Sequence, residues 1–128
     1  MKRPRILIVD DSSVMRKIVE RSLRQAGVDL GDVVEAGNGI EALTAIREGA
    51  FDLILSDINM PVMDGLEFLR QLPSIEGAKE TPVVMVSTEG SESRVVEALS
   101  MGAKGYIRKP FTPDQIKKRV SPLLEVLK

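Results

Sequence analysis

Acidic, hydroxyl and basic side chains stand at the ends of four short apolar runs in this sequence. Asp10 and Asp11 follow ILIV, Asp57 follows DLILS, Ser87 ends PVVMVS, and Lys109 follows GYIR. Each run precedes a helical pattern, so each is typical of a strand in an open α/β sheet. The carboxyl ends of parallel strands meet at one edge of such a sheet, where these side chains would come together. Carboxylates, an ammonium group and a hydroxyl in one place indicate a metal-dependent phosphoryl site.

The charges in such a cluster would not balance without a cation. Asp10, Asp11 and Asp57 together carry −3, and Lys109 returns only +1. Two unit charges about 4 Å apart repel by roughly 4 kcal/mol at an effective dielectric constant near 20, so the cluster should hold a proton or recruit a cation. With oxygen donors only, Mg²⁺ fits better than zinc or copper, and a carbonyl of Asn59 could complete its coordination. An aspartate facing the cation could accept a phosphoryl group as an acyl phosphate.

Each of these residues also has an ordinary structural explanation. Asp10, Asp11 and Ser87 could cap the helices that follow them, while Asp57 and Lys109 could be solvated surface residues. Their occurrence at four strand ends in one order is poorly explained by chance. The functional interpretation of the whole set is therefore favoured over separate structural roles.

Composition excludes several classes of function. The chain has 128 residues, 43% of them hydrophobic, so we expect one domain over residues 1–128 with its own core. It contains no cysteine and no histidine, which excludes disulfides, thiolate nucleophiles, Ser-His-Asp chemistry and His-ligated zinc. Lys and Arg number 18 against 19 Asp and Glu, so nucleic acid is not an expected partner. The ILIV run is too short for a signal peptide or a membrane span, and we expect a cytoplasmic protein.

Five strand-like runs alternate with five stretches of helical spacing. The first, third and fourth runs are almost entirely apolar, as expected for a parallel sheet that helices cover on both faces. The predicted fold class is therefore α/β, a doubly wound five-stranded parallel sheet flanked by five helices. The strands are expected at about Arg5 to Asp10, Val33 to Ala36, Phe51 to Ser56, Pro82 to Ser87 and Lys104 to Arg108.

Caps and breakers predict the ends of the helices. Ser12 or Ser13 can begin a first helix that ends at Gly27, and Asn38 can begin a second that ends at Gly49. A third is expected from Gly65 to Leu72, ended by Pro73 and followed by a surface loop to Thr81, and a fourth from near Ser91 to Gly102. The apolar stripes expected to face the core include Met15, Ile18, Val19 and Leu23, then Ile40, Leu43, Ala45 and Ile46, then Val95, Val96, Ala98 and Leu99.

The last helical pattern contains Pro122 well inside it. An interior proline costs roughly 3 kcal/mol, because one hydrogen bond is lost and the ring clashes with the previous turn. We therefore expect a kink or a break in this helix near Lys118 to Ser121.

Four segments together resemble the receiver domain of bacterial response regulators, most closely the single-domain receivers of chemotaxis. They are ILIVDDSSVMRKIV, DLILSDINMPVMDGLEFL, PVVMVSTEG and AKGYIRKPFTP, and the resemblance covers essentially the whole chain. It implies a flavodoxin-like sheet with strand order 2-1-3-4-5. It also implies a phosphoprotein of a two-component system that is not an enzyme, although it assists its own phosphorylation and dephosphorylation.

The resemblance implies roles for the residues at the strand ends. Asp57 would be the phosphoacceptor, and Lys109, joined to Pro110 by a cis peptide, would contact the phosphoryl oxygens. Mg²⁺ would be bound by Asp11, Asp57 and the backbone carbonyl of Asn59, with Asp10 acting through a coordinated water.

Further residues would report the state of the site and tune it. The Ser87 hydroxyl would move towards the phosphate, and the rotamer of Tyr106 would follow it. Asn59 and Glu89 occupy the positions that tune hydrolysis of the acyl phosphate in this family.

Partners follow from the same resemblance. Because the chain has no histidine, the phosphodonor would be a separate histidine kinase or a small phosphodonor. A monomer would then change its affinity for a protein target, such as a flagellar motor switch, through the surface of its last two helices and last strand. A phosphatase would be a further partner. The alternatives are a receiver in a phosphorelay outside chemotaxis and a Mg²⁺-dependent phosphohydrolase, which Asn59 disfavours because such enzymes place a second acid there.

Overall fold

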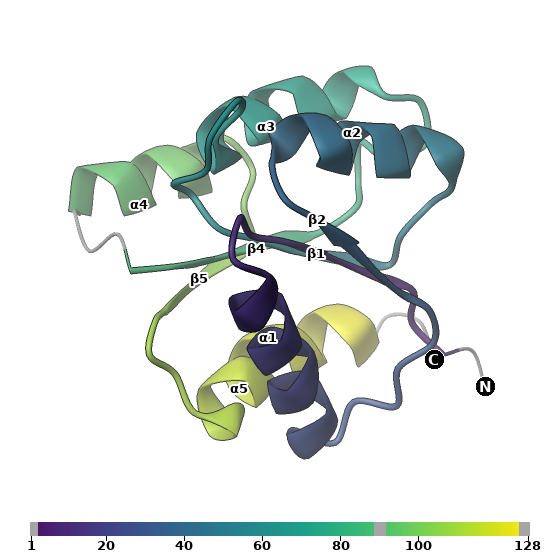
Figure 1. The fold of residues 1–128 in the computed structure, drawn as a ribbon, viewed down its shortest axis with the longest axis vertical. Helices are drawn as coiled ribbons and strands as arrows, with labels where there is room; N and C mark the ends of the chain where they lie inside the picture. The colour runs from purple at the N-terminus through teal and green to yellow at the C-terminus, as the bar shows by residue number, and fades with distance from the viewer. Residues whose placement is uncertain (1–2, 89–91, 126–128) are drawn as a thin grey trace.

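One parallel sheet forms the centre of the molecule. The structure, a computed structural model, describes residues 3–88 and 92–125 of the chain. The strand order is β2-β1-β3-β4-β5, with helices on both faces (Figure 1). Each strand lies within two residues of its predicted position, so the doubly wound fold is confirmed. The strands are β1 (Ile6–Val9), β2 (Val33–Ala36), β3 (Leu53–Ser56), β4 (Val83–Ser87) and β5 (Gly105–Arg108).

The three central strands are buried along their whole length. Every residue of β1, β3 and β4 is buried, whereas the edge strands β2 and β5 are buried only in part. Each fully buried aliphatic side chain contributes about 1.5–3 kcal/mol of transfer free energy, which is why continuous apolar runs belong at the centre of the sheet. The polar residues that end these strands are therefore held by the most stable part of the fold.

Two layers of helices cover the sheet (Figure 1). On one face, α1 and α5 pack against each other, with Val19, Leu23, Ile116 and Val120 in a shared core. On the other face lie α2, α3 and α4, around a second core that includes Phe68. No helix of the described residues is long and apolar enough to cross a membrane. The helices are α1 (Ser13–Gln25), α2 (Gly39–Glu48), α3 (Gly65–Gln71), α4 (Glu92–Ser100) and α5 (Pro113–Glu125).

The predicted helix starts are confirmed where caps can be identified. Ser12 accepts a hydrogen bond from the Met15 N–H at 3.1 Å and Asn38 accepts one from the Glu41 N–H at 2.9 Å, so each satisfies an otherwise unpaired donor of its helix. Gly27, with φ +91°, ends the turn after α1. The start of the fourth helix expected near Ser91 lies outside the described residues, which resume with α4 at Glu92.

Four residues expected in the core are partly exposed instead. Each helix touches the sheet through a narrow face, so only the residues at the centre of the apolar stripe are buried. On α4 this leaves Ala98 buried, with Val96 and Leu99 at 56% and 45% exposure. The prediction was wrong in the same way for Ile18 of α1 and Ile40 of α2.

The third helix ends where it was predicted to end, because α3 stops at Gln71 with Leu72 as its C-cap, just before Pro73. Pro73 itself occupies the first turn of a 3-10 helix over Leu72–Ser74, where its fixed φ is tolerated. The segment after it is more than a surface loop, since Ile75 and Ala78 join the core.

Of the kink or break expected in the last helix near Lys118 to Ser121, the break is not found. The helix α5 continues without interruption over Pro113–Glu125, with Pro122 inside it. The turn that contains Pro122 is anchored by Leu123 and Leu124, which pack against the core shared by α1 and α5. This packing holds the last turn in place although one backbone hydrogen bond is missing.

Candidate functional site

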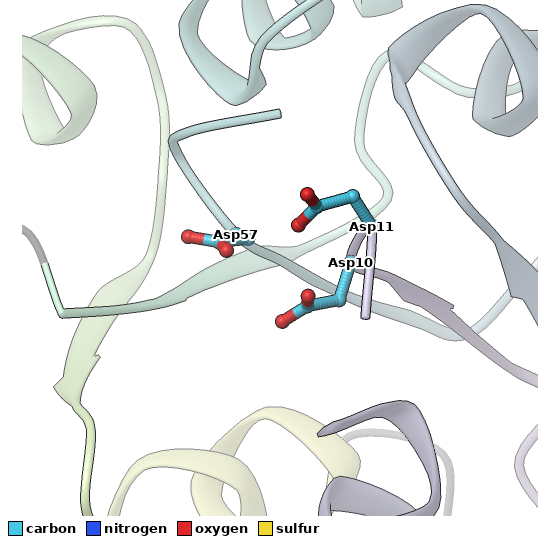
Figure 2. Close-up of side chains that lie close together, drawn as sticks. All are labelled: Asp10, Asp11 and Asp57. Atoms are coloured by element: carbon cyan, nitrogen blue, oxygen red, sulfur yellow. The ribbon is translucent and has the colours of Figure 1, made fainter. Parts of the chain in front are cut away.

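The register of the sheet brings Asp10 and Asp57 together. Val9 at the end of β1 pairs with Ser56 at the end of β3, and the Asp57 N–H donates to the Val9 carbonyl at 2.9 Å. The next residue along each chain is then an aspartate at the carboxyl edge. Figure 2 shows the side chains of Asp10, Asp11 and Asp57 gathered at this edge. One carboxylate oxygen from each lies within 4.8 Å of the others.

These carboxylates differ in their exposure. Asp10 and Asp57 are buried, at 3% and 8% exposure, whereas Asp11 is exposed. The Asp10 Oδ1 atom accepts a hydrogen bond from the Ser12 N–H at 2.9 Å, which fixes its side chain. The cluster therefore combines two buried acids with one exposed acid.

Lys109 directly follows the edge strand β5, and its side chain reaches the acidic cluster. Its Nζ atom lies 2.6 Å from Asp10 Oδ2 and 3.2 Å from Asp57 Oδ2, and its side chain is only 9% exposed. Burial alone would lower the pKa of this ammonium, but the hydrogen bond to Asp10 and the charges of Asp57 and Asp10 outweigh that effect and raise the pKa. Lys109 is therefore a fixed positive charge at neutral pH. The expected cis peptide between Lys109 and Pro110 is present.

Both oxygens of Asp57 have defined partners. Oδ1 accepts hydrogen bonds from the N–H groups of Ile58 at 2.7 Å and Asn59 at 3.4 Å, while Oδ2 contacts Lys109. The Gly65 N–H donates to the Ile58 carbonyl at 2.7 Å, which holds the start of α3 next to the segment that carries Asp57. The position of the Asp57 carboxylate thus depends on the backbone on both sides of it.

The donor set fits a hard divalent cation. Three carboxylates carry −3 and Lys109 offsets +1, so a dication brings the cluster to neutrality. All donors are oxygens, which suits Mg²⁺ because that ion prefers oxygen ligands and retains several waters. Asn59 lies exposed beside the cluster, where its carbonyl could contribute. The residues present are therefore compatible with a Mg²⁺ site.

Ser87 at the end of β4 is connected to Tyr106 within the neighbouring strand β5. Ser87 is fully buried, and its backbone carbonyl accepts hydrogen bonds from the Tyr106 hydroxyl at 3.1 Å and the Lys109 N–H at 3.0 Å. Tyr106 is half-buried. Tyr106 thus shares the Ser87 carbonyl as an acceptor with Lys109, the residue that contacts Asp57. Glu89, the remaining expected site residue, lies outside the described residues.

One polar residue near the site was missed in the sequence. The guanidinium of Arg16, on α1, donates to the Asp10 carbonyl at 2.6 Å. The only sequence signal was a basic residue about one turn into the helix that follows an acidic pair, which is common on helix surfaces. Its contact with Asp10 became apparent only from the folded chain.

Comparisons with known proteins agree with this geometry. Residues 6–121 match the family described as response regulator receiver domain. The chain is 39% identical over 126 residues to the chemotaxis protein CheY-3 of Vibrio cholerae serotype O1, covering 98% of this chain and 95% of the relative. It is 39% identical over 121 residues to the chemotaxis protein CheY1 of Helicobacter pylori, covering 94% and 96%. A solved structure of the Vibrio cholerae chemotaxis protein CheY4 has a TM-score of 0.84 at 37% identity, covering 96% of this chain and 100% of that one.

The family match, together with the doubly wound sheet and the acidic site, places the chain in a class of signalling domain that is switched by phosphorylation. The chain belongs to the response regulator receiver domain family, and its curated relatives include CheY proteins.

Proposed function

We propose that the chain, as one receiver domain over residues 1–128, is a chemotaxis signalling switch that accepts a phosphoryl group on Asp57. The observation that carries this proposal is the buried Lys109 ammonium, which bridges Asp10 and Asp57 at 2.6 and 3.2 Å. A buried carboxylate with an adjacent fixed cation suits a nucleophile that gains negative charge when modified.

The transfer would exchange one bond to phosphorus for another. An Asp57 carboxylate oxygen forms a bond to phosphorus while the phosphorus–nitrogen bond of a donor phosphohistidine breaks. The electron pair leaves with the imidazole, which takes up a proton from solvent. Lys109 stays within reach of the new phosphoryl oxygens and offsets their charge.

Mg²⁺ would be held by Asp11, Asp57 and the backbone carbonyl of Asn59, with Asp10 acting through a water. The clustering of the three carboxylates supports this assignment. When bound, the ion supplies charge neutralisation at the phosphoryl oxygens. The chain's own contribution is to hold the acids close together although they repel one another, which the buried ends of β1 and β3 do.

Output would pass from Ser87 and Tyr106 to the surface formed by α4, β5 and α5. Phosphorylation removes one carboxylate charge and adds roughly two, and the Ser87 hydroxyl and Lys109 are the groups that would answer that change. The exposed side chains of Val96 and Leu99 on α4 support a protein-binding role for this surface, because exposed apolar groups at helical spacing favour docking. Asn59 and Glu89 would tune the lifetime of the acyl phosphate.

The partners we propose are a histidine kinase as phosphodonor, a flagellar motor switch or analogous protein as target, and a phosphatase. Similarity to relatives named as chemotaxis proteins supports this choice over a receiver from another pathway. We propose that the protein acts in the cytoplasm as a monomer.

Phosphorylation of Asp57 can be tested with a small phosphodonor and Mg²⁺, followed by intact-protein mass spectrometry. We expect one phosphoryl adduct on the wild type and on the control variant Asp114→Asn, which alters an exposed aspartate of α5. We expect none on Asp57→Ala. An adduct that persists in Asp57→Ala would reject Asp57 as the acceptor, and steady turnover of an added phosphomonoester would favour a phosphohydrolase instead.

The chemotaxis assignment needs a separate experiment. The protein, with and without a stable phosphoryl mimic at Asp57, would be used to capture proteins from an extract in Mg²⁺. Recovery of a flagellar switch protein only with the mimic is the expected result. Recovery of transcriptional or unrelated phosphorelay proteins instead would assign the receiver to another pathway.

A further inference from the structure

Arg16 connects the acidic pair to the neighbouring edge strand. It lies on α1, one turn after the helix begins, and its side chain is only 18% exposed. Its Nη1 atom donates a hydrogen bond to the Asp10 backbone carbonyl at 2.6 Å, and its Nε atom donates one to Glu35 Oε1 at 2.8 Å. One guanidinium therefore spans from β2 to the peptide that leaves β1.

Glu35 holds the other end of this bridge. It lies on β2, opposite Ile8 of β1, and its second oxygen accepts a hydrogen bond from Lys17 Nζ at 2.6 Å. The hydrogen bonds from Lys17 and Arg16 lower the pKa of Glu35, so its carboxylate is charged at neutral pH. With both carboxylate oxygens engaged, Glu35 restricts the orientation of the planar guanidinium.

The carbonyl that Arg16 binds belongs to the peptide unit between Asp10 and Asp11. Because a peptide unit is planar, an anchored carbonyl fixes the whole plane and with it the position of the Asp11 Cα atom. Within residues 3–88 and 92–125, no hydrogen bond or ion pair is found for the Asp11 carboxylate, which is exposed. The direction of that carboxylate therefore depends on its backbone.

We propose that Arg16, held in place by Glu35, is a positioning residue that presents the Asp11 carboxylate to the cation shared with Asp57. This inference rests on the proposed Mg²⁺ site. It assigns to α1 and β2 a part in cation binding, although neither Arg16 nor Glu35 is among the proposed ligands.

Charge and position predict opposite effects of removing Arg16. If the guanidinium acted only as a positive charge near the acids, its removal would strengthen cation binding, because a repulsion would be lost. If it orients the Asp10–Asp11 peptide, its removal weakens binding. The sign of the change in Mg²⁺ affinity thus separates the two roles.

The test measures the Mg²⁺ dissociation constant of the unphosphorylated protein by isothermal titration calorimetry. For Arg16→Gln we expect binding about tenfold weaker, equal to about 1.4 kcal/mol, because the charged hydrogen bond that orients the Asp10–Asp11 peptide is lost. Arg21→Gln is the matched control, because it removes one positive charge from an exposed side chain of the same helix and leaves Asp10, Lys17 and Glu35 unchanged. We expect its affinity to equal or exceed that of the wild type.

Three further variants keep the test decisive. Glu35→Ala should also weaken Mg²⁺ binding. A double variant that combines Glu35→Ala with Arg16→Gln should bind Mg²⁺ no more weakly than Arg16→Gln alone, because the two residues act as one unit. Denaturant unfolding in a chelator checks that each variant is folded. If Arg16→Gln does not fold, the Mg²⁺ affinities of Glu35→Ala and Arg16→Lys test the positioning role instead. Arg16→Lys is expected to retain only part of the wild-type affinity.

The outcomes separate the inference from the proposed function. A wild type that binds no Mg²⁺ would reject the cation site and the inference together. A wild type that binds Mg²⁺, with an Arg16→Gln variant that binds it equally or more tightly, would overturn the positioning role alone.

Discussion

Gly65 offers a sharp test of how the fold holds Asp57, the proposed phosphoacceptor. This glycine begins α3 next to the segment that carries Asp57. A Cβ atom at this position would collide with the Asp57 carbonyl oxygen and would lie only 2.9 Å from Ile58 Cα and from the terminal methyl of Met85. The methyl of Met85 can move aside by side-chain rotation, whereas the two backbone atoms move only if the chain itself shifts. The substitution Gly65→Ala should therefore displace the backbone of Asp57 itself.

The size of the effect follows from these distances. Carbon atoms pack at about 3.5 Å or more, so Ile58 Cα must recede by about 0.6 Å, and the Asp57 carbonyl must move further. Overpacking of this kind costs about 1–3 kcal/mol, and contact with three atoms places Gly65→Ala near about 3 kcal/mol. Since a 1 Å misplacement of a reacting group can cost about 100-fold, we expect phosphorylation to slow by about tenfold or more.

The assay combines denaturant unfolding with the rate of phosphorylation by a small phosphodonor. Gly105→Ala is the matched control, because its added Cβ would lie 3.7 Å from Arg119 Cδ, which is an ordinary contact. That variant should keep the wild-type phosphorylation rate and gain about 0.4–1 kcal/mol of stability. A Gly65→Ala protein with wild-type stability and rate would refute the argument that this contact fixes Asp57.

Three other changes have defined outcomes. Val62 has φ 69°, which is unfavourable for a β-branched residue but tolerated by Asn, and its side chain is 83% exposed. Val62→Asn should therefore raise the free energy of unfolding by about 1 kcal/mol and shift the denaturant midpoint upward. An unchanged midpoint would show that no strain is stored there. Lys109→Ala leaves two buried carboxylates unpaired, so unfolding in a chelator should become easier by about 3 kcal/mol, with partial recovery in Mg²⁺; equal stability would contradict the ion pairing. The lowered pKa of Glu35 adds stability above its ordinary pKa of 4.5, and this stability is lost as the pH falls through the lower pKa of the folded state. Glu35→Gln should therefore flatten the dependence of the unfolding free energy on pH in that acidic range. An unaltered pH profile would contradict the pairing of Glu35 with Lys17 and Arg16.

The sequence was sufficient for the sheet and for the positions of its polar ends. Apolar runs such as Ile6–Val9 and Leu53–Ser56 are unambiguous when helices cover both faces, because nothing else in a short domain buries every residue of a strand. The exposure of Val96 and Leu99 was not predictable, since periodicity locates a stripe but not the width of the face that meets the sheet. The continuity of α5 past Pro122 was not predictable from local cost alone, because it depends on the tertiary packing of Leu123 and Leu124.

The site was predictable to the extent that it depends on strand ends. Asp10 and Asp57 lie at paired register positions, so their proximity follows from the strand order. The bridge from Arg16 to Glu35 spans residues 19 apart and depends on which face of α1 meets β2, a tertiary fact that no local pattern encodes. The identity of the partners is even less predictable from the sequence, because it depends on surfaces that the core does not constrain.

Tyr106 gives the molecule an optical reporter of its own. It is the one tyrosine of a chain without tryptophan, so the near-ultraviolet absorption and fluorescence of the native protein come chiefly from this residue. Its hydroxyl donates to the same Ser87 carbonyl that accepts the Lys109 N–H, which places the chromophore one shared acceptor away from the residue that contacts Asp57. Events at the acidic edge can therefore be followed in real time in the unlabelled protein, without a dye, a fusion or an engineered side chain.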